Sequence, residues 1–194
     1  MPSTSEVGHA KNVANLQKLT EQVITFTNYN PPVENLKIVN LQALYTAASI
    51  KLTDVEDKRH ANKNAITLRQ SAFENLKSTS TKIINHLEIL GLPQGTIDQA
   101  KSLNRIIQGG QKKTTTPPDE NGQPAPTVSI SRQSYTQQAE NFGILLQLLA
   151  TIPSYAPNED DLKLVNLNAY KDSLVSSTQS VDQTEAELNT KLIE

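Results

Sequence analysis

Apolar residues recur every three or four positions along much of this chain, which is the spacing of one face of an amphipathic helix. The first such segment is expected to end near Asn28. Its apolar positions are Val13, Leu16, Leu19, Val23 and Phe26. Asn30 is a candidate helix cap, and Pro31 suits the first turn of a helix, where its missing N–H would be unpaired anyway. The pattern predicts a helix, a Pro-containing turn and a second helix.

The second and third predicted helices have heptad-like apolar spacing. The apolar positions are Leu41, Ala48 and Val55 in the second helix, and Ile66, Phe73, Leu76, Ile83, Leu87 and Leu90 in the third. Residues 54–64 between them are nearly all polar, so we expect a break or a tip there, followed by a return helix. Gly91 is well placed to end the third helix in the left-handed conformation, with Pro93 just beyond it.

A short fourth helix and a linker follow. Thr96 and Gln99 have the spacing of a capping box, which predicts that the helix begins there. Gly109 and Gly110 are expected to end it. Residues 109–127 are rich in Pro, Gly and Thr, a composition typical of linkers, and the alternation in residues 128–131 suits a short extended segment.

The last third of the chain predicts two more helices. One begins near Ser134 or Tyr135 and ends before Pro153, with Phe142, Leu145, Leu146 and Leu149 as its apolar positions. Asn158 is a good cap for the last helix, and the acidic residues 159–161 suit a positive helix N-terminus better than a calcium loop, whose ligand pattern is missing. Its apolar residues Leu167, Leu174, Val181 and Leu188 lie seven apart, and it is expected to run to the chain end.

Two stretches, residues 29–44 and 155–170, share half of their positions. The identical pairs are Tyr29/Tyr155, Pro31/Pro157, Leu36/Leu162, Lys37/Lys163, Val39/Val165, Asn40/Asn166, Leu41/Leu167 and Ala43/Ala169. Unrelated segments would share roughly one such position, so we interpret the pair as an internal repeat of a helical hairpin. Packing one hairpin on the other about a pseudo-twofold axis predicts an all-α antiparallel helical bundle with long helices and a Pro/Thr-rich linker.

The pattern also divides the chain. We expect a flexible N-terminus over residues 1–11, a first helical unit over 12–108, a linker with a short extended segment over 109–133, and a second helical unit over 134–194 that packs on the first in one composite domain. The third helix has no counterpart before Glu194. Either the second unit is incomplete or the natural chain continues.

The composition limits the kinds of chemistry that this chain can carry out. The chain has no cysteine, which excludes disulfides, thiolate nucleophiles and zinc–thiolate sites. The net charge of −2 predicts no general attraction to nucleic acid or to anionic membranes. The N-terminus lacks the pattern of a secretory signal peptide, and the longest apolar-rich run, residues 142–152, is well short of the ~20 residues that span a bilayer. We expect a soluble protein that is cytoplasmic, or exported without a cleaved signal peptide.

The segments TKIINHLEILGLPQGTIDQAKSLNRIIQGGQKK and SISRQSYTQQAENFGILLQLLATIPSYAPNEDDLKLVNLNAY, together with the repeat, resemble a family of uncharacterised bacterial proteins. Members of that family are all-helical and are built from two related halves. The resemblance covers most of residues 12–175 and is most specific in the Tyr-x-Pro turns and in the segments that flank the linker. It implies an all-helical fold, and it implies no activity, cofactor or catalytic residue. Family members often continue past a segment like the end of this one.

The histidines and glycines do not form a recognised site. The histidines are His9, His60 and His86, and a di-iron bundle needs two Glu-x-x-His pairs, whereas only residues 57–60 approach this spacing, with Asp in place of Glu. The chain contains neither a Gly-x-Ser-x-Gly motif nor a phosphate-binding glycine loop. We therefore assign no catalytic, cofactor-binding or metal-ligating residue, and we expect no cofactor.

Other polar residues also favour a structural role. The basic residues Lys58, Arg59, Lys63 and Arg69, with Lys112 and Lys113 in the linker, are interrupted by Glu56 and Asp57, which suits a solvated helix tip better than a nucleic-acid site. Tyr29 and Tyr155 are expected to pack over their turns with their hydroxyls in water, rather than to serve as a pair of binding anchors. The repeated residues Lys37/Lys163 and Asn40/Asn166 are expected to stabilise the hairpins.

The sequence favours a non-enzymatic helical bundle that acts through protein–protein interaction or self-assembly. The partner is then an unknown protein or a second copy, with no role for nucleic acid and membrane contact disfavoured. The alternative is a leaderless, exported, membrane-acting protein, such as a component of a helical pore-forming toxin. That alternative needs an apolar hairpin that can leave the bundle, and residues 142–152 are the only candidate. An enzyme with a non-obvious site is a third hypothesis.

Overall fold

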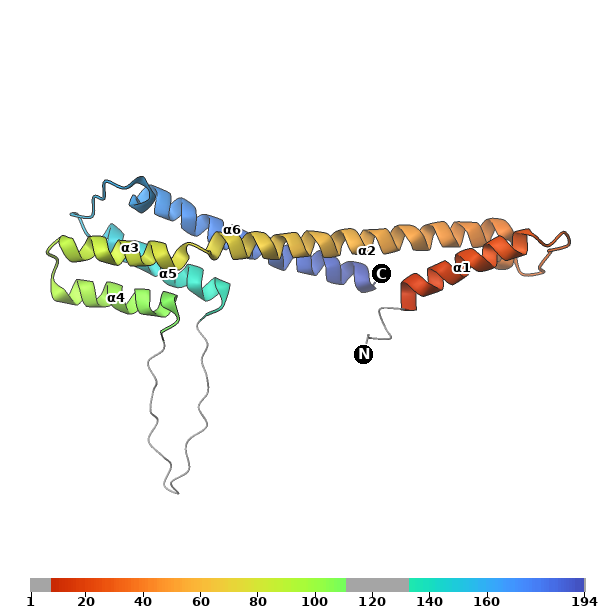
Figure 1. The fold of residues 1–194 in the computed structure, drawn as a ribbon, viewed down its shortest axis with the longest axis horizontal. Coiled ribbons are helices and arrows are strands. Elements are labelled where there is room, and N and C mark those ends of the chain that lie inside the picture. The colour runs from red at the N-terminus through yellow and green to blue at the C-terminus, as the bar shows by residue number, and fades with distance from the viewer. Residues whose placement is uncertain (1–7, 111–132, 194) are drawn as a thin grey trace, which may run out of the picture. The chain divides into compact units, whose positions relative to one another are not determined.

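In the computed structural model, residues 8–110 and 133–193 are described, and all regular structure in this part of the chain is helical (Figure 1). The α-helices are α1 (Gly8–Ile24), α2 (Ile38–Phe73), α3 (Leu76–Ile89), α4 (Gln94–Gln108), α5 (Tyr135–Ala150) and α6 (Leu164–Ile193). Two short 3-10 helices, η1 (Glu34–Leu36) and η2 (Asp160–Leu162), precede α2 and α6. The predicted all-α fold class is confirmed.

The chain divides into two compact units, residues 1–64 with 183–194 and residues 65–182. In the first unit, α1 folds back beside the start of α2 (Figure 1), and the Tyr45 hydroxyl donates to the Gln17 side-chain oxygen at 3.2 Å. The end of α6 joins this unit through an ion pair between Lys58 and Glu187 at 2.8 Å. The expected packing of one hairpin on the other about a pseudo-twofold axis stays a prediction, as do the predicted domain limits.

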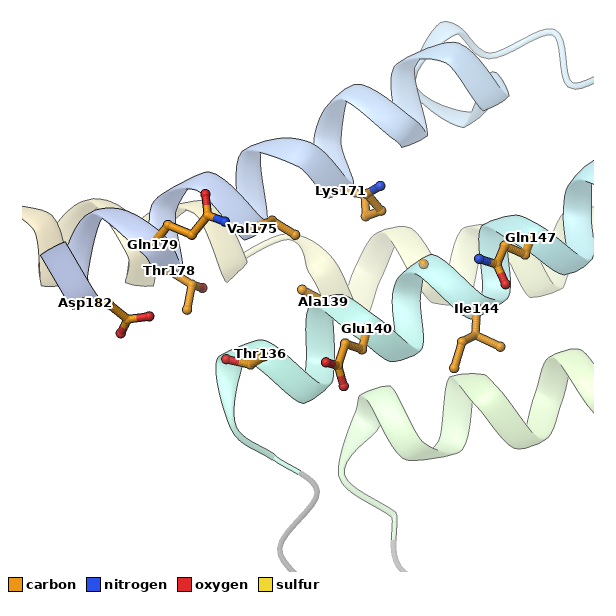
Figure 2. A pocket seen from close by; sticks show the side chains of 11 residues that line it. Thr136, Ala139, Glu140, Ile144, Gln147, Lys171, Val175, Thr178, Gln179 and Asp182 are labelled. Carbon is orange, nitrogen blue, oxygen red and sulfur yellow. The ribbon is translucent and has the colours of Figure 1, made fainter.

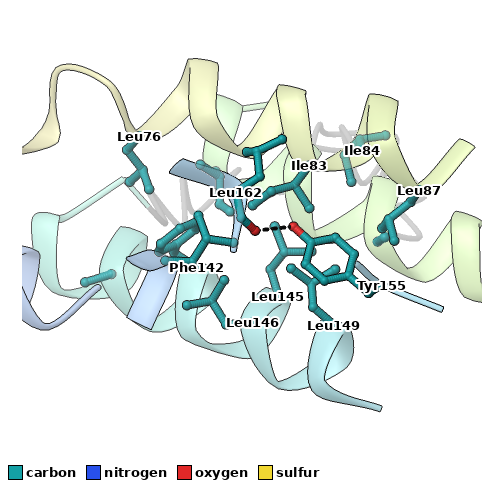
Figure 3. Packing of buried hydrophobic residues seen from close by; sticks show 14 of the residues in the cluster. Leu76, Ile83, Ile84, Leu87, Phe142, Leu145, Leu146, Leu149, Tyr155 and Leu162 are labelled. Carbon is teal, nitrogen blue, oxygen red and sulfur yellow. Dashed lines mark hydrogen bonds between the residues drawn. The ribbon is translucent and has the colours of Figure 1, made fainter. Parts of the chain in front are cut away.

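The second unit has an aliphatic core (Figure 3). Helix α4 packs against both α3 and α5, and α3 contacts η2. The fully buried side chains include Leu76, Ile83, Leu87, Ile107, Phe142, Leu145, Leu149, Leu167 and Leu174. Burying one large aliphatic side chain contributes ~1.5–3 kcal/mol, so this cluster is the main stabilising feature of the unit. The predicted seven-residue spacing in the last helix is confirmed for Leu167, Leu174 and Val181, which are all buried, whereas Leu188 is only half-buried.

The predicted break within residues 54–64 is wrong. Helix α2 runs without interruption through this polar stretch for 36 residues. The segment contains neither Gly nor Pro, and its charges pair along the helix, as Arg59 does with Glu56 at 2.7 Å. The chain instead leaves the helix between Phe73 and Leu76, where Asn75 takes the N-cap position of α3.

Several predicted helix ends also need correction. Helix α1 begins at Gly8 rather than at residue 12, and α4 begins at Gln94 after Pro93, so Thr96 lies inside the helix and forms no capping box. Asn30 and Asn158 cap no α-helix, because an extended stretch and a 3-10 turn precede α2 and α6. Most of the predicted linker and its extended segment, residues 111–132, lie outside the described residues.

Other predicted ends are confirmed. Gly91 and Gly109 have positive φ angles of 64° and 91°, the left-handed conformation that ends a helix without a Cβ penalty. Helix α5 begins at Tyr135, and the side chain of Ser134 accepts a hydrogen bond from the Gln137 amide at 3.2 Å. This cap satisfies one of the amides that a helix N-terminus leaves unpaired.

Candidate functional site

The two repeated turns contain the same tyrosine hydrogen bond. The hydroxyl of Tyr29 donates to the Leu36 carbonyl at 2.7 Å, and the hydroxyl of Tyr155 donates to the Leu162 carbonyl at 2.8 Å. The expectation that the hydroxyls lie in water is therefore wrong for Tyr155, whose hydrogen bond is buried, whereas the hydrogen bond of Tyr29 is exposed. Each ring crosses its turn and satisfies the last carbonyl of the 3-10 helix, which is one of the acceptors that a helix end leaves free.

The repeated asparagines and lysines hold the same turns, as predicted. The side-chain amide of Asn40 donates to the Glu34 carbonyl at 2.7 Å, and that of Asn166 donates to the Asp160 carbonyl at 2.6 Å. Lys37 pairs with Glu34, and Lys163 pairs with Asp160, each three residues apart. The two turns thus have the same hydrogen-bonded structure, with corresponding residues 126 positions apart.

The first hairpin consists of α1, η1 and α2, and the second hairpin consists of α5, η2 and α6. The turn of the second hairpin is covered by α3. Lys82 forms an ion pair with Asp161 at 3.0 Å, and the ring of His86 meets the ring of Tyr155 edge-on at 5.3 Å. Tyr155 is almost fully buried; this burial raises the pKa of its hydroxyl to about 12, and the Asp161 carboxylate adds to the shift. The second hairpin therefore has its turn and its apolar side shielded from water.

The corresponding side of the first hairpin is open. Four large apolar side chains lie there, and we call them the uncovered face: Leu19, Phe26, Leu36 and Leu44. Their exposed fractions lie between 46 and 60%. The counterparts in the second hairpin are Leu145, Ile152, Leu162 and Tyr170, of which the first three are at most 7% exposed. The fourth counterpart, Tyr170, donates its hydroxyl hydrogen to the Ala72 carbonyl at 2.8 Å.

A second feature is a groove of about 620 Å³ between α5 and α6 (Figure 2). The residues that line it are Thr136, Ala139, Glu140, Gly143, Ile144 and Gln147 from α5, and Lys171, Val175, Thr178, Gln179 and Asp182 from α6. In the first hairpin, the counterparts of Gly143 and Lys171 are Gln17 and Tyr45, whose side chains hydrogen-bond to each other. The groove therefore exists where a glycine and a lysine replace a bridging pair.

The groove has few groups suited to catalysis. Figure 2 shows Asp182 and Thr136 toward one end and Lys171 and Gln147 toward the other. Lys171 is paired with its neighbour Asp172 at 2.9 Å. Histidine is absent from its lining, and within residues 8–110 and 133–193 there is no group of three or more His, Asp or Glu side chains that could hold a metal ion. The groove can accept a ligand by shape, and it contains no paired nucleophile and base.

The residues considered from the sequence stay dispersed in the structure. His9 lies on α1, His60 on α2 and His86 on α3. Lys58 is paired with Glu187, Arg59 is paired with Glu56, and the guanidinium of Arg69 lies 4.3 Å from the centre of the Tyr135 ring. Lys112 and Lys113 lie outside the described residues. Lys58 and Arg59 thus pair with carboxylates and Arg69 lies against an aromatic ring, but all three lie on one continuous helix, so the solvated helix tip predicted for them is wrong.

Gly143 offers a direct test of the groove. A Cβ added there would meet the Lys171 Cδ at 3.5 Å, an ordinary contact. Because glycine inside a helix costs about 0.5–1 kcal/mol relative to alanine, Gly143→Ala is expected to stabilise the protein by that amount in urea unfolding. Gly109→Ala is the matched control, and it should destabilise, because Gly109 has a φ of 91° and the added Cβ would lie 3.1 Å from the Gln133 side-chain oxygen. A destabilising Gly143→Ala would contradict the open geometry of the groove.

None of the described helices is both long and apolar enough to cross a membrane. Searches of protein-family models, curated proteins and solved structures find no match to this chain.

Proposed function

We propose that this chain acts through protein–protein contact, and that the first helical hairpin is its interaction element. The single observation that supports the proposal is the uncovered face. Four large apolar side chains are about half exposed at positions whose counterparts in the second hairpin are covered by other helices. A contiguous exposed apolar patch on a folded protein often marks an interaction site, because burying its apolar groups in a contact lowers the free energy.

The same backbone geometry in both turns supports this interpretation. The two hairpins share their turn hydrogen bonds, so the difference in burial does not come from a different local fold. It comes from α3, which contacts the second turn, and from α4, which packs against α5. A hairpin of this design therefore has a side suited to contact with further helices, and on the first hairpin that side is available.

The membrane-acting alternative has less support. Its candidate segment, residues 142–152, contributes the fully buried side chains Phe142, Leu145 and Leu149 to the core of the second unit. Release of this segment would expose that core to water at a cost of ~1.5–3 kcal/mol for each large side chain. Protein–protein contact through the uncovered face requires no such rearrangement. The resemblance to a family of bacterial proteins with two related halves is compatible with this proposal and assigns no activity to it.

Site-specific photo-crosslinking tests the proposal. A benzophenone-containing amino acid replaces Phe26 in the full chain, which is expressed in the cells that naturally make it. The matched control places the same group at Val39, which is 65% exposed and lies on the same hairpin. Val39 and Leu44 are five residues apart on α2, a rotation of ~140° about the helix, so Val39 points away from the uncovered face.

An adduct of defined mass is expected from position 26, at about ten times the yield from position 39, because a specific contact excludes water from one side of the hairpin only. An adduct of any protein partner, including a second copy, supports the proposal. Equal yields at the two positions, or no adduct at position 26, would show that the uncovered face makes no specific contact.

A further inference from the structure

We infer that the uncovered face binds the same face of a second copy of this chain, so that two α1–α2 hairpins form a twofold-symmetric four-helix contact. This inference rests on the proposed function and names the partner. The starting point is the shape of the hairpin. Helix α1 is 17 residues long, about 25 Å, and it lies beside the start of α2 (Figure 1).

The apolar side chains come from both helices of the hairpin and from its turn. Leu19 lies on α1, Leu44 on α2, and Phe26 and Leu36 lie between the two helices. Two antiparallel hairpins that meet face to face around a twofold axis form a four-helix bundle, in which each apolar stripe fills the groove of the other. A symmetric contact needs only one patch, because the same residues serve on both sides.

Charge is the observation that favours a second copy. In a symmetric contact each charged group near the axis meets its own copy, so an unpaired like charge is repelled. The turn of the second hairpin has Glu159 and Asp161, whereas the first hairpin has Val33 and Asn35 at the corresponding positions. The remaining acidic side chain in the first turn, Glu34, forms an ion pair with Lys37 within the hairpin. The first turn thus lacks the charges that would oppose a symmetric contact.

The way α3 covers the second hairpin does not suit the first. Lys82 of α3 meets the carboxylate of Asp161, and Asn35 occupies the corresponding place in the first hairpin. The Lys82–Asp161 pair is exposed, at 53 and 59%, and a covering element like α3 would lack even this weak contact on the first hairpin. A partner that suits this turn therefore offers apolar surface in place of the lysine. The first hairpin itself presents such a surface, with Val33 52% exposed.

Sedimentation velocity of the purified full chain tests this inference from about 1 to about 100 µM, a range that brackets micromolar affinity. The molar mass is expected to rise with concentration from 21.3 kDa toward twice that value. Leu44→Glu should weaken the dimer at least ~100-fold in Kd, because it places two carboxylates near the axis in an apolar contact. Val39→Glu is the matched control and should leave Kd within about twofold, since it points away from the face. Both positions are exposed, at 56 and 65%, so neither variant should unfold the hairpin.

The outcomes separate this inference from the proposed function. A monomer across the whole range would overturn the second-copy inference. If position 26 then gave an adduct with a different protein in cells, the proposed function would stand with another partner. A dimer that tolerates Leu44→Glu would place the contact elsewhere and overturn the inference as well. A far-ultraviolet circular dichroism spectrum unchanged by Leu44→Glu would show that lost dimerisation does not reflect unfolding.

Discussion

Leu167→Asp is expected to destabilise strongly the compact unit formed by residues 65–182. Leu167 is completely buried on α6, in the aliphatic core formed with α3 and α5. The substitution removes an apolar side chain and leaves a carboxylate among aliphatic neighbours without a partner. An unpaired buried charge costs several kcal/mol, against a total stability of ~5–15 kcal/mol for a typical domain. The melting midpoint should therefore fall by about 10 °C or more.

Val165→Asp provides the matched control on the same helix. Val165 lies two residues away and is 73% exposed, so its carboxylate would stay in water. The expected change in unfolding free energy is within about 0.5 kcal/mol, as for most surface substitutions. Thermal unfolding followed by circular dichroism compares the two variants at the same protein concentration. Similar melting midpoints for the two would contradict the assignment of Leu167 to the core.

The repeated turns show what the sequence can predict. Tyr29, Asn40 and their counterparts stood out because they recur at a fixed offset, and a stabilising role for the asparagines followed from that recurrence. The acceptor of the tyrosine hydroxyl could not be predicted. It is the carbonyl of Leu36, seven residues further on, and it comes within reach only because a 3-10 helix folds the chain back under the ring. The sequence pattern favoured a simple N-cap at this point, and the 3-10 helix replaced it.

The error in α2 has a different cause. Apolar periodicity vanishes over residues 54–64, so the pattern alone favoured a break. A helix can continue without an apolar stripe as long as its residues tolerate the helical conformation. Residues 54–64 contain neither glycine nor proline, the residues that most disfavour it. Pairs such as Arg59 with Glu56 fit along the helix surface. The actual break lies near Asn75, where neither proline nor glycine marks it.

The groove and the uncovered face were missed for a common reason. The groove depends on a missing side chain at Gly143, and the uncovered face depends on the lack of a helix packed against it. The signal for the groove was available in the aligned halves, because Gly143 stands where the first hairpin has Gln17. The uncovered face had no such signal, since Leu19 and Leu145 are the same residue at the same place in the repeat. Only the position of α3 and α4 distinguishes them, and periodicity along one helix says nothing about which helices will cover it.

Because Leu19 and Leu145 are the same residue at corresponding positions, replacing each of them by alanine gives a matched pair of variants. Leu145 is completely buried, and Leu145→Ala is expected to cost about 2–5 kcal/mol, through lost apolar burial and the cavity that remains. Leu19 is 48% exposed, so Leu19→Ala in the monomer should cost less than about 1 kcal/mol, because much of its surface is already in water. Urea unfolding of both variants measures the difference at about 1 µM protein, a concentration below the expected Kd of the dimer.

Repeating the measurement at a higher protein concentration also tests whether the uncovered face binds a second copy. Binding to the folded state stabilises it by mass action, so a dimer formed through the uncovered face makes the wild-type chain more stable as concentration rises. Leu19→Ala weakens that contact, and its cost should therefore increase at about 100 µM, whereas the cost of Leu145→Ala should stay the same. A concentration-independent cost for Leu19→Ala would exclude this face from the dimer. Equal costs for the two variants at low concentration would mean that the first hairpin is covered within its own chain.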